Sequence, residues 1–484
     1  MTYKGYEAVI GLEIHVQLKT KSKAFSADPI SFGAKPNTQV NPISLGHPGT
    51  LPVLNASAVE YAIRLGLACQ SKITYLNKFA RKNYFYADLP KGYQISQYTT
   101  PICTDGFVMI KDDDGNDKKI GLIRIHIEED SGKSIHDIDP YYTLIDLNRA
   151  GTPLLEIVSK PDFRNGQEAY NYLAEMRKLV RYLDISDGNM EEGSLRCDVN
   201  ISVRKVGAES FGTKVEIKNM NSFRNVQKAI DYEIIRQVDC LEKGEFITQE
   251  TRTYDPLKNT TSVMRTKEDA HDYRYFTDPD LAPLKITEEF ILSVQKAMPA
   301  LPWEIKNTLI QDHGLSEYDA SQICEIKEEA QYYLECTRYS SSYKNIANYI
   351  LGPIRSYLNE NATQIPSFPL SPKKLAELIR LVDMDLVSHS IAQGKLFQAL
   401  LDNPDTHPEE LARQLNLIQE RDEDVLTRTA REVLDSMPEK VAQYKAGKTG
   451  LLGLFMGEVM KRTHGKADPK LASSILQNLL NQHQ

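Results

Sequence analysis

Alternating hydrophobic and polar residues mark several short segments in the first 290 residues of the chain. In DVNISVR, residues 198–204, Val199, Ile201 and Val203 fall on one side of the predicted strand and polar residues fall on the other. Because successive side chains of a strand point to opposite faces, this pattern predicts a sheet with one apolar and one polar face. The same period of two recurs in GLEIHVQL (11–18), RIHIEED (124–130), LIDLN (144–148) and TKVEIKN (213–219).

Helical periodicity interrupts these strands and then takes over the chain. Apolar residues recur at helical spacing in residues 56–70 and 168–183, with Gly and Pro clustered in the intervening turns. After DPDLAPL (278–284) helix follows helix, with a break at IPSFPLSP (365–372). We therefore predict an α+β fold with a largely antiparallel sheet in residues 1–293, followed by an all-α helical domain in 294–405 and a helical tail domain in 406–484.

The length and composition are those of a folded protein with two or three domains. The chain has 484 residues, of which 41% are hydrophobic and 26% are charged. No stretch approaches the ~18 apolar residues that cross a bilayer, and the first residues do not resemble an export signal. The six cysteines include no CxxC pair, which argues against a disulfide scaffold and a cysteine-based zinc site. We therefore expect a cytoplasmic protein.

Charge is distributed unevenly along the chain. The net charge is −8, but from Glu439 to the end seven Lys and Arg stand against three acids, so this region carries +4 and the rest −12. The whole chain is therefore not expected to attract nucleic acid, whereas its basic end could approach a phosphate backbone.

The polar positions of the predicted strands carry many carboxylates, imidazoles and amides. A sheet whose outer face meets water gives the same alternation, so a solvated face is one interpretation. Glu, Asp, His and Asn are also oxygen and nitrogen ligands for a divalent ion such as Mg²⁺, so a metal-binding face is the other interpretation. The residues of this face are Glu13, His15, Gln17, Arg124, His126, Glu128, Asp146, Asn148, Asp198, Asn200, Lys214, Glu216 and Lys218.

Phosphoryl transfer is a chemistry that a metal-binding face would serve. It needs Mg²⁺ to bridge phosphate oxygens and fixed cations to hold the remaining charge. The sequence has no phosphate-loop motif, because SGKS (131–134) and GKTG (447–450) have Ile127 and Ala442 where the earlier glycine is required. HExxH and GxSxG motifs are also absent. The candidate cations, each of which can equally be an ordinary surface residue, are Lys82, Arg149, Arg204, Arg265 and Arg274.

Several long motifs give nearly the whole chain a resemblance to one family. The sequence resembles the B subunit of the bacterial aspartyl/glutamyl-tRNA(Asn/Gln) amidotransferase. Long motifs in one order are far more specific than a single short pattern. The motifs are GLEIHVQLKTKSKAF (11–25), RKNYFYADLPKGYQISQY (81–98), HIEEDSGKSIH (126–136), DLNRAGTPLLEIVS (146–159), NMEEGSLRCDVNISVR (189–204), EIKNMNSFRNVQKAIDYE (216–233), DYRYFTDPDLAPL (272–284) and GLLGLFMGEVMKRTHGKADPKLASSIL (450–476).

The resemblance implies a reaction on the side-chain carboxylate of misacylated Glu-tRNA(Gln) or Asp-tRNA(Asn). Mg·ATP would phosphorylate this carboxylate, because a carboxylate itself is a poor acyl electrophile. Ammonia released from glutamine on a partner amidase (A) subunit would then pass through a tunnel and displace the phosphate. The resemblance also implies a glutamine-synthetase-like sheet and a heterotrimer that includes a small C subunit.

Matching the family's motifs residue by residue assigns roles on the polar face. The resemblance implies metal ligands at Glu13, His15, Glu128, Asp198 and Glu216. It implies catalytic roles for Glu128, Glu129 and Lys82. The cations that we assign to ATP are Arg149, Arg204 and Arg274.

Four of the matched residues leave alternatives open. Alternation puts Glu129 on the face opposite Glu128, so either a bulge turns it inward or it lines the ammonia path. Lys82 is a second candidate for the mouth of that path. Glu191 and Glu192 precede their strand and can be merely solvated acids of a turn.

One loop departs from the family's pattern. Many relatives have four zinc-binding cysteines where this chain has Ser26, Asp28, Asn41 and Ser44. Because no thiolate remains, we expect no zinc in this loop. Packing by other residues must then hold the loop, and the candidates are Pro29, Pro36 and Pro42.

The basic end of the chain has two interpretations. In GLLGLFMGEVM, Gly450, Gly453 and Gly457 would let another backbone approach closely, which is ordinary helix packing. The family instead favours a tRNA-contacting surface, whose lysines and arginine would position phosphates rather than read bases. The candidates for those contacts are Lys448, Lys461, Arg462, Lys466 and Lys470.

Two other functions compete with the amidotransferase subunit. A non-catalytic tRNA-binding scaffold would keep the acidic face for structural reasons alone. A free-standing metal-dependent phosphohydrolase would act on small phosphate esters without partners. The amidotransferase subunit explains the polar face, the missing phosphate loop and the basic tail together, so we predict this function.

Overall fold

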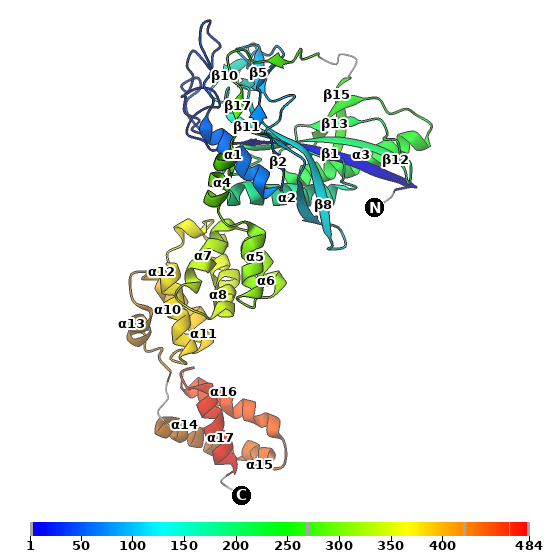
Figure 1. Cartoon of the computed structure of the whole chain (residues 1–484). Helices are drawn as coiled ribbons and strands as arrows, with labels where there is room; N and C mark the ends of the chain where they lie inside the picture. The colour runs from blue at the N-terminus through cyan, green and yellow to red at the C-terminus, as the bar shows by residue number, and fades with distance from the viewer. Residues whose placement is uncertain (1–2, 267–271, 420–422, 464, 482–484) are drawn as a thin grey trace. The chain divides into compact units, whose positions relative to one another are not determined.

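The computed structural model describes residues 3–266, 272–419, 423–463 and 465–481 (Figure 1). The chain divides into two compact units, Met1–Leu301 and Pro302–Gln484. Helix α4 (Glu288–Ala297) packs against α1 (Ala56–Ala68) and buries Ile291 and Val294 in the core of the first unit. The first unit therefore extends past residue 293, while the further division near residue 405 stays a prediction.

The first unit is built on one long sheet, whose strands follow the order β15-β14-β13-β12-β1-β11-β8-β6-β2, with β7 paired to β8. Neighbouring strands are antiparallel, except that β13 and β14 run parallel. This confirms the α+β class and the largely antiparallel sheet. The strands are β1 (Tyr6–Gln17), β2 (Lys72–Ile73), β6 (Cys103–Thr104), β7 (Phe107–Lys111), β8 (Asp117–Glu129), β11 (Pro153–Ser159), β12 (Leu195–Lys205), β13 (Val215–Lys218), β14 (Glu250–Asp255) and β15 (Thr260–Thr266).

Helices α1, α2 (Gly166–Tyr182) and α3 (Phe223–Glu242) cover the apolar face of this sheet. Each helix begins where a side chain caps it: Asn55, Asn165 and Ser222 accept hydrogen bonds from backbone N–H groups of the first turn. The predicted alternation is confirmed, because the aliphatic residues of β1, β12 and β13 are buried beneath these helices. The buried residues are Leu12, Ile14, Val16, Val199, Ile201, Val203, Val215 and Ile217.

Short strands form three smaller sheets in the first unit. They are β9 (Lys133–Ile135) with β10 (Leu144–Asp146), β4 (Ala80–Asn83) with β5 (Tyr93–Ser96) and β16 (Phe276–Thr277), and β3 (Leu76–Asn77) with β17 (Leu284–Lys285).

The segment LIDLN was placed on the wrong sheet by its alternation. It forms β10, which pairs with β9 and not with a strand of the main sheet. The side chains of Asp146 and Asn148 accept hydrogen bonds from the backbone N–H groups of Asn37 and Gln39, at 3.1 and 2.9 Å. These two residues therefore hold a loop and do not belong to the polar face.

The four positions that replace zinc-binding cysteines form a hydrogen-bonded group, which we call the loop cluster: Ser26, Asp28, Asn41 and Ser44. The Ser26 hydroxyl donates to Asp28 Oδ2 at 3.0 Å, and the Ser44 hydroxyl donates to the same oxygen. Asn41 Oδ1 accepts from the backbone N–H of Ser44 at 3.1 Å. The donor set has neither thiolate nor imidazole, and its oxygens are used for one another, so it does not fit zinc.

A buried lysine lies beside the loop cluster and gives stability a pH dependence. Lys23 is 1% exposed, and its Nζ lies 3.9 Å from Asp28 Oδ2. Burial lowers the pKa of Lys23 from 10.5 to about 8, although Asp28 and Glu129 oppose this shift. Between these two values the unfolded chain holds a proton that the folded chain has lost, so the free energy of unfolding rises with pH, by at most about 1.4 kcal/mol per pH unit.

Replacing Lys23 should remove this rise of the free energy of unfolding with pH. Between pH 7.5 and 9.5 the free energy of unfolding should rise in wild type, whereas Lys23→Met should lack this rise. The difference, variant minus wild type, is therefore expected to fall by about 1–2 kcal/mol over this range. Denaturant unfolding followed by circular dichroism at several pH values measures this difference. Lys21→Met, at an exposed position nearby, should keep the wild-type slope. Parallel curves for Lys23→Met and wild type would show that Lys23 keeps its ordinary pKa.

The second unit consists of helices with short connections, as predicted. One hydrophobic cluster joins α14, α16 and α17, and it includes Leu426, Phe455 and Leu476. No described helix is long and apolar enough to cross a membrane. The helices are α5 (Pro302–Gln311), α6 (Glu317–Cys324), α7 (Lys327–Thr337), α8 (Tyr343–Tyr349), α9 (Arg355–Glu360), α10 (Pro372–Asp383), α11 (His389–Ile391), α12 (Phe397–Asp402), α13 (Pro408–Gln414), α14 (Glu423–Ser436), α15 (Pro438–Lys445), α16 (Leu452–Arg462) and α17 (Pro469–Asn481).

The glycines of the tail do not mediate close packing. A Cβ atom added to Gly450, Gly453 or Gly457 would meet no described atom within 4 Å. The interpretation of these glycines as sites of close backbone approach is therefore wrong, because apolar side chains such as Phe455 and Val459 make the contacts of α16 instead.

Candidate functional site

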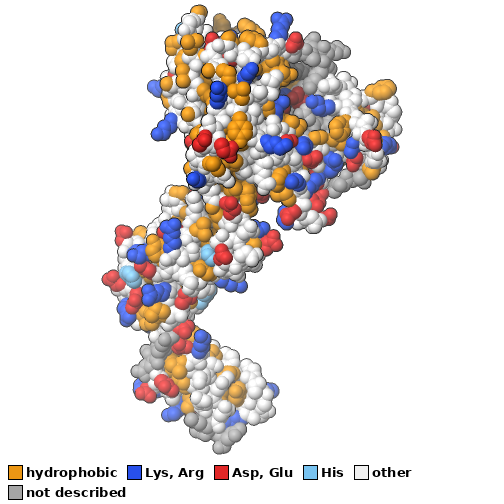
Figure 2. Space-filling model, in the orientation of Figure 1, with side chains coloured by type: hydrophobic (Ala, Val, Ile, Leu, Met, Phe, Trp, Pro, Cys, Tyr) orange, Lys and Arg blue, Asp and Glu red, His pale blue; other side chains and the backbone are white. Residues whose placement is uncertain are grey.

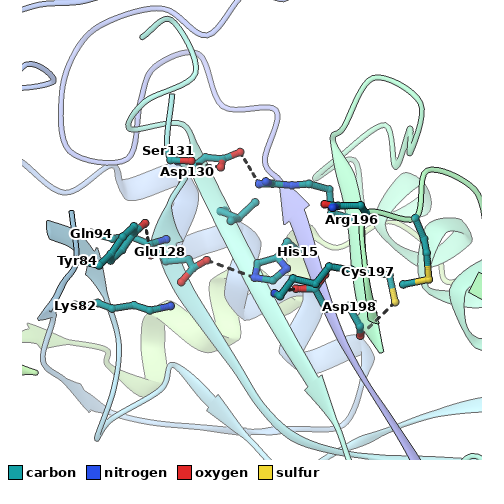
Figure 3. Close-up of a pocket in the computed structure, with 14 residues that line it drawn as sticks. His15, Lys82, Tyr84, Gln94, Glu128, Asp130, Ser131, Arg196, Cys197 and Asp198 are labelled. Carbon is teal, nitrogen blue, oxygen red and sulfur yellow. Dashed lines mark hydrogen bonds and ion pairs between the residues drawn. The ribbon is translucent and has the colours of Figure 1, made fainter. Parts of the chain in front are cut away.

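A polar cavity of about 340 Å³ lies on the face of the main sheet that the helices leave uncovered (Figure 3). Side chains from β1, β8 and β12 form its floor, and residues of β4 and β5 form one wall. The lining residues are His15, Lys82, Tyr84, Gln94, Glu128, Asp130, Ser131, Leu154, Arg196, Cys197, Asp198, Lys218, Asn219 and Met220.

Strand register brings the carboxylates and imidazoles of the cavity floor together. Glu156 on β11 lies between His126 on β8 and His15 on β1, because it is paired with both. The Nε2 atoms of His15 and His126 lie 3.5 and 3.4 Å from Glu156 Oε2. Glu128 extends this group, at 3.8 Å from His15 Nε2 and 3.5 Å from His126 Nε2.

Two sets of three side chains in this group have ligand atoms close enough to share a metal ion. One set is Glu13, His15 and Glu156, and the other is His126, Glu128 and Glu156. In each set the ligand atoms lie within 4.8 Å of one another. Glu156 belongs to both sets, so it is the central carboxylate of what we call the acidic cluster: Glu13, His15, His126, Glu128 and Glu156.

Charges within the acidic cluster perturb one another strongly. Burial raises the pKa of Glu13, and the nearby carboxylates of Glu156 and Asp198 raise it further. Burial alone would lower the pKa of His126, but Glu156 and Glu128 raise it to about 9. The same two carboxylates raise the pKa of His15 against its burial. Negative charge is therefore in excess here, which favours a divalent cation bound by carboxylate and imidazole ligands.

Fixed cations stand on two sides of the acidic cluster. Lys218 Nζ donates to Asp198 Oδ2 at 2.5 Å and lies 3.3 Å from Glu216 Oε1. Burial would lower the pKa of Lys218, but these two carboxylates raise it. On the opposite side, the charges of Glu128 and Glu156 raise the pKa of Lys82 against its burial. Both lysines therefore remain charged at neutral pH.

A third cation, Arg196, lines one end of the cavity. Its Nη2 donates to Asp130 Oδ2 at 2.6 Å (Figure 3). Gln17 Nε2 donates to the same oxygen at 2.7 Å. Arg149 lies behind this pair and donates to the backbone carbonyls of Ser131 and Gly132, at 2.9 and 2.6 Å. The buried Nε of Arg196 has no hydrogen-bond partner within the described part of the chain. Asp130 and Gln17 therefore fix the end of the cavity at which the partly exposed guanidinium of Arg196 lies.

The structure brings most of the predicted site residues together. Lys82, Glu128, His15 and Asp198 line the cavity itself. Glu13 pairs across the sheet with Asp198, and Glu216 lies beside Lys218.

Glu129 is the exception among the predicted carboxylates. It pairs with Pro153 directly after the pairing of Glu128 with Leu154, so no bulge turns it toward the cavity. Its side chain forms an ion pair with Lys91 and accepts a hydrogen bond from the backbone N–H of Ile95 at 2.9 Å. Glu129 is therefore buried on the other face, where it cannot join the acidic cluster.

The three arginines predicted to bind ATP do not line the cavity. Arg204 shares the face of Arg196 but lies eight residues along β12, roughly 26 Å away, and it pairs with Glu7 at 2.7 Å. Arg274 is exposed on the segment before β16. Arg149 supports the cavity wall from behind, and the side chain of Arg265 lies outside the described residues. Arg196 lines the cavity where Arg204 does not, since alternation fixes the face of a residue but not its position along the sheet; binding of ATP by any of these arginines stays a prediction.

Several residues of the cavity were not selected from the sequence. Arg196 lies two residues before DVNISVR and continues its alternation. Lys218 and His126 were placed on the polar face, but no role was predicted for either. Asp130 is the last residue of RIHIEED, where alternation puts it on the face of Glu128, but it lies one residue beyond the end of β8 and was not selected. Glu156 lies in PLLEIVS, where nearly every residue is buried, and a strand buried on both faces shows no alternation.

The basic residues selected in the tail lie at the ends of its helices. Lys461 is mostly exposed, and Arg462 is less so because it contacts Glu458 and Glu432 at 3.6 and 3.8 Å. Lys448 precedes a short 3-10 helix, Thr449–Leu451, and Lys470 lies in the first turn of α17. Lys466 is half-buried. Contact of any of these residues with tRNA stays a prediction.

Comparison with known proteins gives matches along almost the entire chain. Residues 8–292 match the family model described as the GatB/GatE catalytic domain, and residues 331–480 match the GatB domain. The B subunit of the aspartyl/glutamyl-tRNA(Asn/Gln) amidotransferase from Salinibacter ruber is 47% identical, over 99% of this chain and 98% of that protein. The protein of the same name from Persephonella marina is 48% identical, over 98% of this chain and 99% of that protein.

Proposed function

The chain belongs to the GatB/GatE family, and from this membership and the acidic cluster we propose that it phosphorylates the side-chain carboxylate of a misacylated tRNA with ATP. As one of the B subunits of tRNA-dependent amidotransferases, it acts on Glu-tRNA(Gln), Asp-tRNA(Asn) or both. The observation that carries the proposal is a cluster of carboxylates and imidazoles that reaches the open cavity through His15 and Glu128, where Lys82, Arg196 and Lys218 also line the cavity.

Magnesium fits the acidic cluster and supplies the Lewis-acid chemistry that phosphoryl transfer needs. Glu13, Glu128 and Glu156 would be its carboxylate ligands, with Asp198 close by. The pKa shifts support this assignment: burial and then the charges of Glu156 and Asp198 raise the pKa of Glu13, and the neighbouring carboxylates raise the pKa of both imidazoles. Zinc has no fitting donor set in the loop cluster, and we expect none there.

The residues around the cluster position the two reactants. Lys218 and Arg196 would hold phosphate oxygens of ATP from two sides, and Lys82 would attract the substrate carboxylate. An oxygen of that carboxylate then attacks the γ-phosphorus, the bond to the leaving oxygen of ADP breaks, and an acyl phosphate forms on the aminoacyl group. Ammonia next attacks the acyl carbon, phosphate leaves, and the amide remains after loss of a proton.

An antiparallel sheet with carboxylates on its open face is also the arrangement of the glutamine-synthetase type of fold. Support for that finer assignment comes from the register of β8, β11, β1, β12 and β13, which carries the acidic cluster on one face and the helices on the other.

Other polypeptides complete the proposed reaction. An amidase subunit would release ammonia from glutamine, and a small third subunit would complete a heterotrimer. Glu129 and Lys91 form a buried ion pair on the face opposite the cavity, which supports a place for Glu129 on an ammonia path rather than at the metal. The basic residues of the tail would hold tRNA phosphates.

The direct test uses the complete complex with charged Glu-tRNA(Gln), labelled Mg·ATP and no amide donor. ATP cleavage that depends on the charged tRNA is the expected result. The absence of cleavage even with glutamine present, while tRNA still binds, would favour a non-catalytic tRNA-binding scaffold. Cleavage of small phosphate esters by the chain alone would favour a phosphohydrolase.

The two arginines on one face of β12, Arg196 and Arg204, give a matched pair of variants for the same assay. Arg196→Lys keeps the charge but loses the planar guanidinium that binds Asp130 while lining the cavity, so kcat/KM for ATP is expected to fall roughly 10- to 100-fold. Arg204→Lys, at the other end of the same strand face, should stay within about twofold of wild type. The reverse result would restore Arg204 as the phosphate-binding residue.

A further inference from the structure

A row of tyrosine rings begins at the cavity and leads away from it. Tyr84 lines the cavity, and its ring centroid lies 6.1 Å from that of Tyr273. The next centroids, of Tyr273 and Tyr275, are again 6.1 Å apart. Tyr275 then stacks on Tyr98 with centroids 4.1 Å apart and an interplanar angle of 8°. We call these four residues, Tyr84, Tyr273, Tyr275 and Tyr98, the tyrosine row.

The tyrosines of the row flank strands β4, β5 and β16, which are paired with one another. Strand β16 pairs with β4, and the backbone N–H of Asn83 donates to the carbonyl of Tyr273 at 2.9 Å. The side chain of Asn83 donates to the carbonyl of Arg274 at 2.8 Å. Arg81 joins the same segments through Asp278 and Asp280, at 2.8 and 2.7 Å. The rings are therefore held in place before any ligand binds.

One cation, Lys82, lies beside the inner rings of the row, and a second, Arg81, lies beside the neighbouring Tyr93. Lys82 Nζ lies 4.9 Å from the ring centroid of Tyr273 and 5.9 Å from that of Tyr84. The same ammonium interacts with Glu128 and Glu156 of the acidic cluster, so it connects the row to the cavity. The Arg81 guanidinium lies 4.2 Å from the ring centroid of Tyr93.

The outer end of the row is open to solvent. Tyr98, at the outer end, is 53% exposed, and beside the inner end Tyr86, whose ring centroid lies 5.9 Å from that of Tyr84, is 56% exposed. A cluster that served only to pack the fold would bury these rings. Figure 2 shows hydrophobic side chains, with Lys and Arg between them, gathered over the part of the first unit that carries β5 and β17.

Rings next to cations suit unpaired nucleotides. Every base has a face that stacks on an aromatic side chain, and phosphates between successive bases pair with cations. ATP brings one base, whereas the row offers ring after ring from the cavity outward. A single-stranded RNA end brings several consecutive bases, and in an aminoacyl-tRNA the amino acid is attached to its last nucleotide.

We propose that the tyrosine row binds the unpaired 3′ end of the aminoacyl-tRNA and thereby directs the aminoacyl group toward Lys82 and the acidic cluster. This inference rests on the proposed function, since it takes the substrate from it. Stacking of one base on one aromatic ring changes affinity roughly 5- to 150-fold.

The test compares ring variants in the complete complex. Tyr98→Ala is expected to raise KM for Glu-tRNA(Gln) about tenfold and to leave KM for ATP unchanged, whereas Tyr98→Trp should restore tRNA affinity. Tyr318→Ala, which removes an exposed tyrosine of α6, is the matched control and should behave as wild type. A rise in KM for ATP alone would assign the row to the nucleotide and overturn the proposal, and so would an unchanged KM for tRNA.

A binding measurement separates this proposal from the proposed function. Wild-type complex should bind tRNA that lacks its three terminal nucleotides about tenfold more weakly than intact tRNA, and Tyr98→Ala should bind both equally. This comparison needs no catalysis, so it stands even if tRNA-dependent ATP cleavage is not found. Equal binding of intact and shortened tRNA by wild type would overturn the tyrosine row while leaving the phosphorylation reaction untouched.

Discussion

Glu156→Gln is expected to reduce tRNA-dependent ATP cleavage by a factor on the order of 10³ and to leave the protein folded. Glu156 is the carboxylate that belongs to both possible metal sets, and it is the nearest acid to His15 and His126. The amide has the same shape but no charge, so any divalent ion bound by either set would lose an anionic ligand. No other single change in the cluster affects both sets in the same way.

The fold should tolerate this change because the histidines can adjust. Glu156 and Glu128 keep the pKa of His126 raised, and removing one of these charges lets the imidazole become neutral instead of leaving a buried cation without a partner. The β1–β11 and β11–β8 backbone pairing does not depend on the side chain. Circular dichroism and tRNA binding of the assembled complex check that the variant is folded.

The rate of ATP cleavage is measured with charged tRNA and no amide donor. Glu192→Gln makes the same chemical change at an exposed turn before β12 and should behave as wild type. Raising the magnesium concentration should recover part of the lost rate if the defect lies in metal affinity. Full activity of Glu156→Gln at ordinary magnesium concentration would remove the acidic cluster from the reaction.

Alternation in the sequence predicted which face each polar residue of the sheet would occupy. Side chains of a strand alternate strictly, so Glu13 and His15 had to share a face, as did Glu216 and Lys218. The apolar residues between them had to face the helices, and Ile14 and Ile217 are fully buried there. This part of the fold follows from local geometry and needs no information on pairing.

Alternation does not predict the register between neighbouring strands. Arg196 and Arg204 alternate identically, yet only Arg196 is paired opposite His15, close to the acidic cluster. LIDLN alternates as well as any other strand, but it pairs with β9 in a separate sheet. Contacts between segments distant in the sequence decide these positions, and no local period reports them.

The role of strand β11 was the hardest to predict from the sequence. β11 has neighbours on both sides and is buried along nearly its whole length, so apolar residues occupy both of its faces. Glu156 is then one acid in an otherwise apolar run, and its importance arises only from the two histidines that register places beside it. The family resemblance predicts a reaction on this face but did not compensate for the missing register.

Lys218→Met is expected to lower the rate of tRNA-dependent ATP cleavage roughly 100-fold while tRNA binding persists. Lys218 is the cation that faces the acidic cluster from the β13 side, where Asp198 and Glu216 hold its ammonium and keep its pKa raised. A charged group held in place before the reaction needs no reorganisation when negative charge develops on the transferred phosphate. Met keeps the length of the side chain and removes only the charge.

A control on the same strand face separates this role from general electrostatics. Lys214 precedes β13, belongs to the same alternation and is exposed to solvent, so Lys214→Met removes the same charge without emptying the site. Its rate should stay within about twofold of wild type, because exposed charges are screened by water and salt. If both variants lost activity equally, the effect would come from the long-range field of the chain. If neither variant lost activity, Arg196 and Lys82 alone would hold the phosphate. Lys218 would then serve only to separate the carboxylates of Asp198 and Glu216.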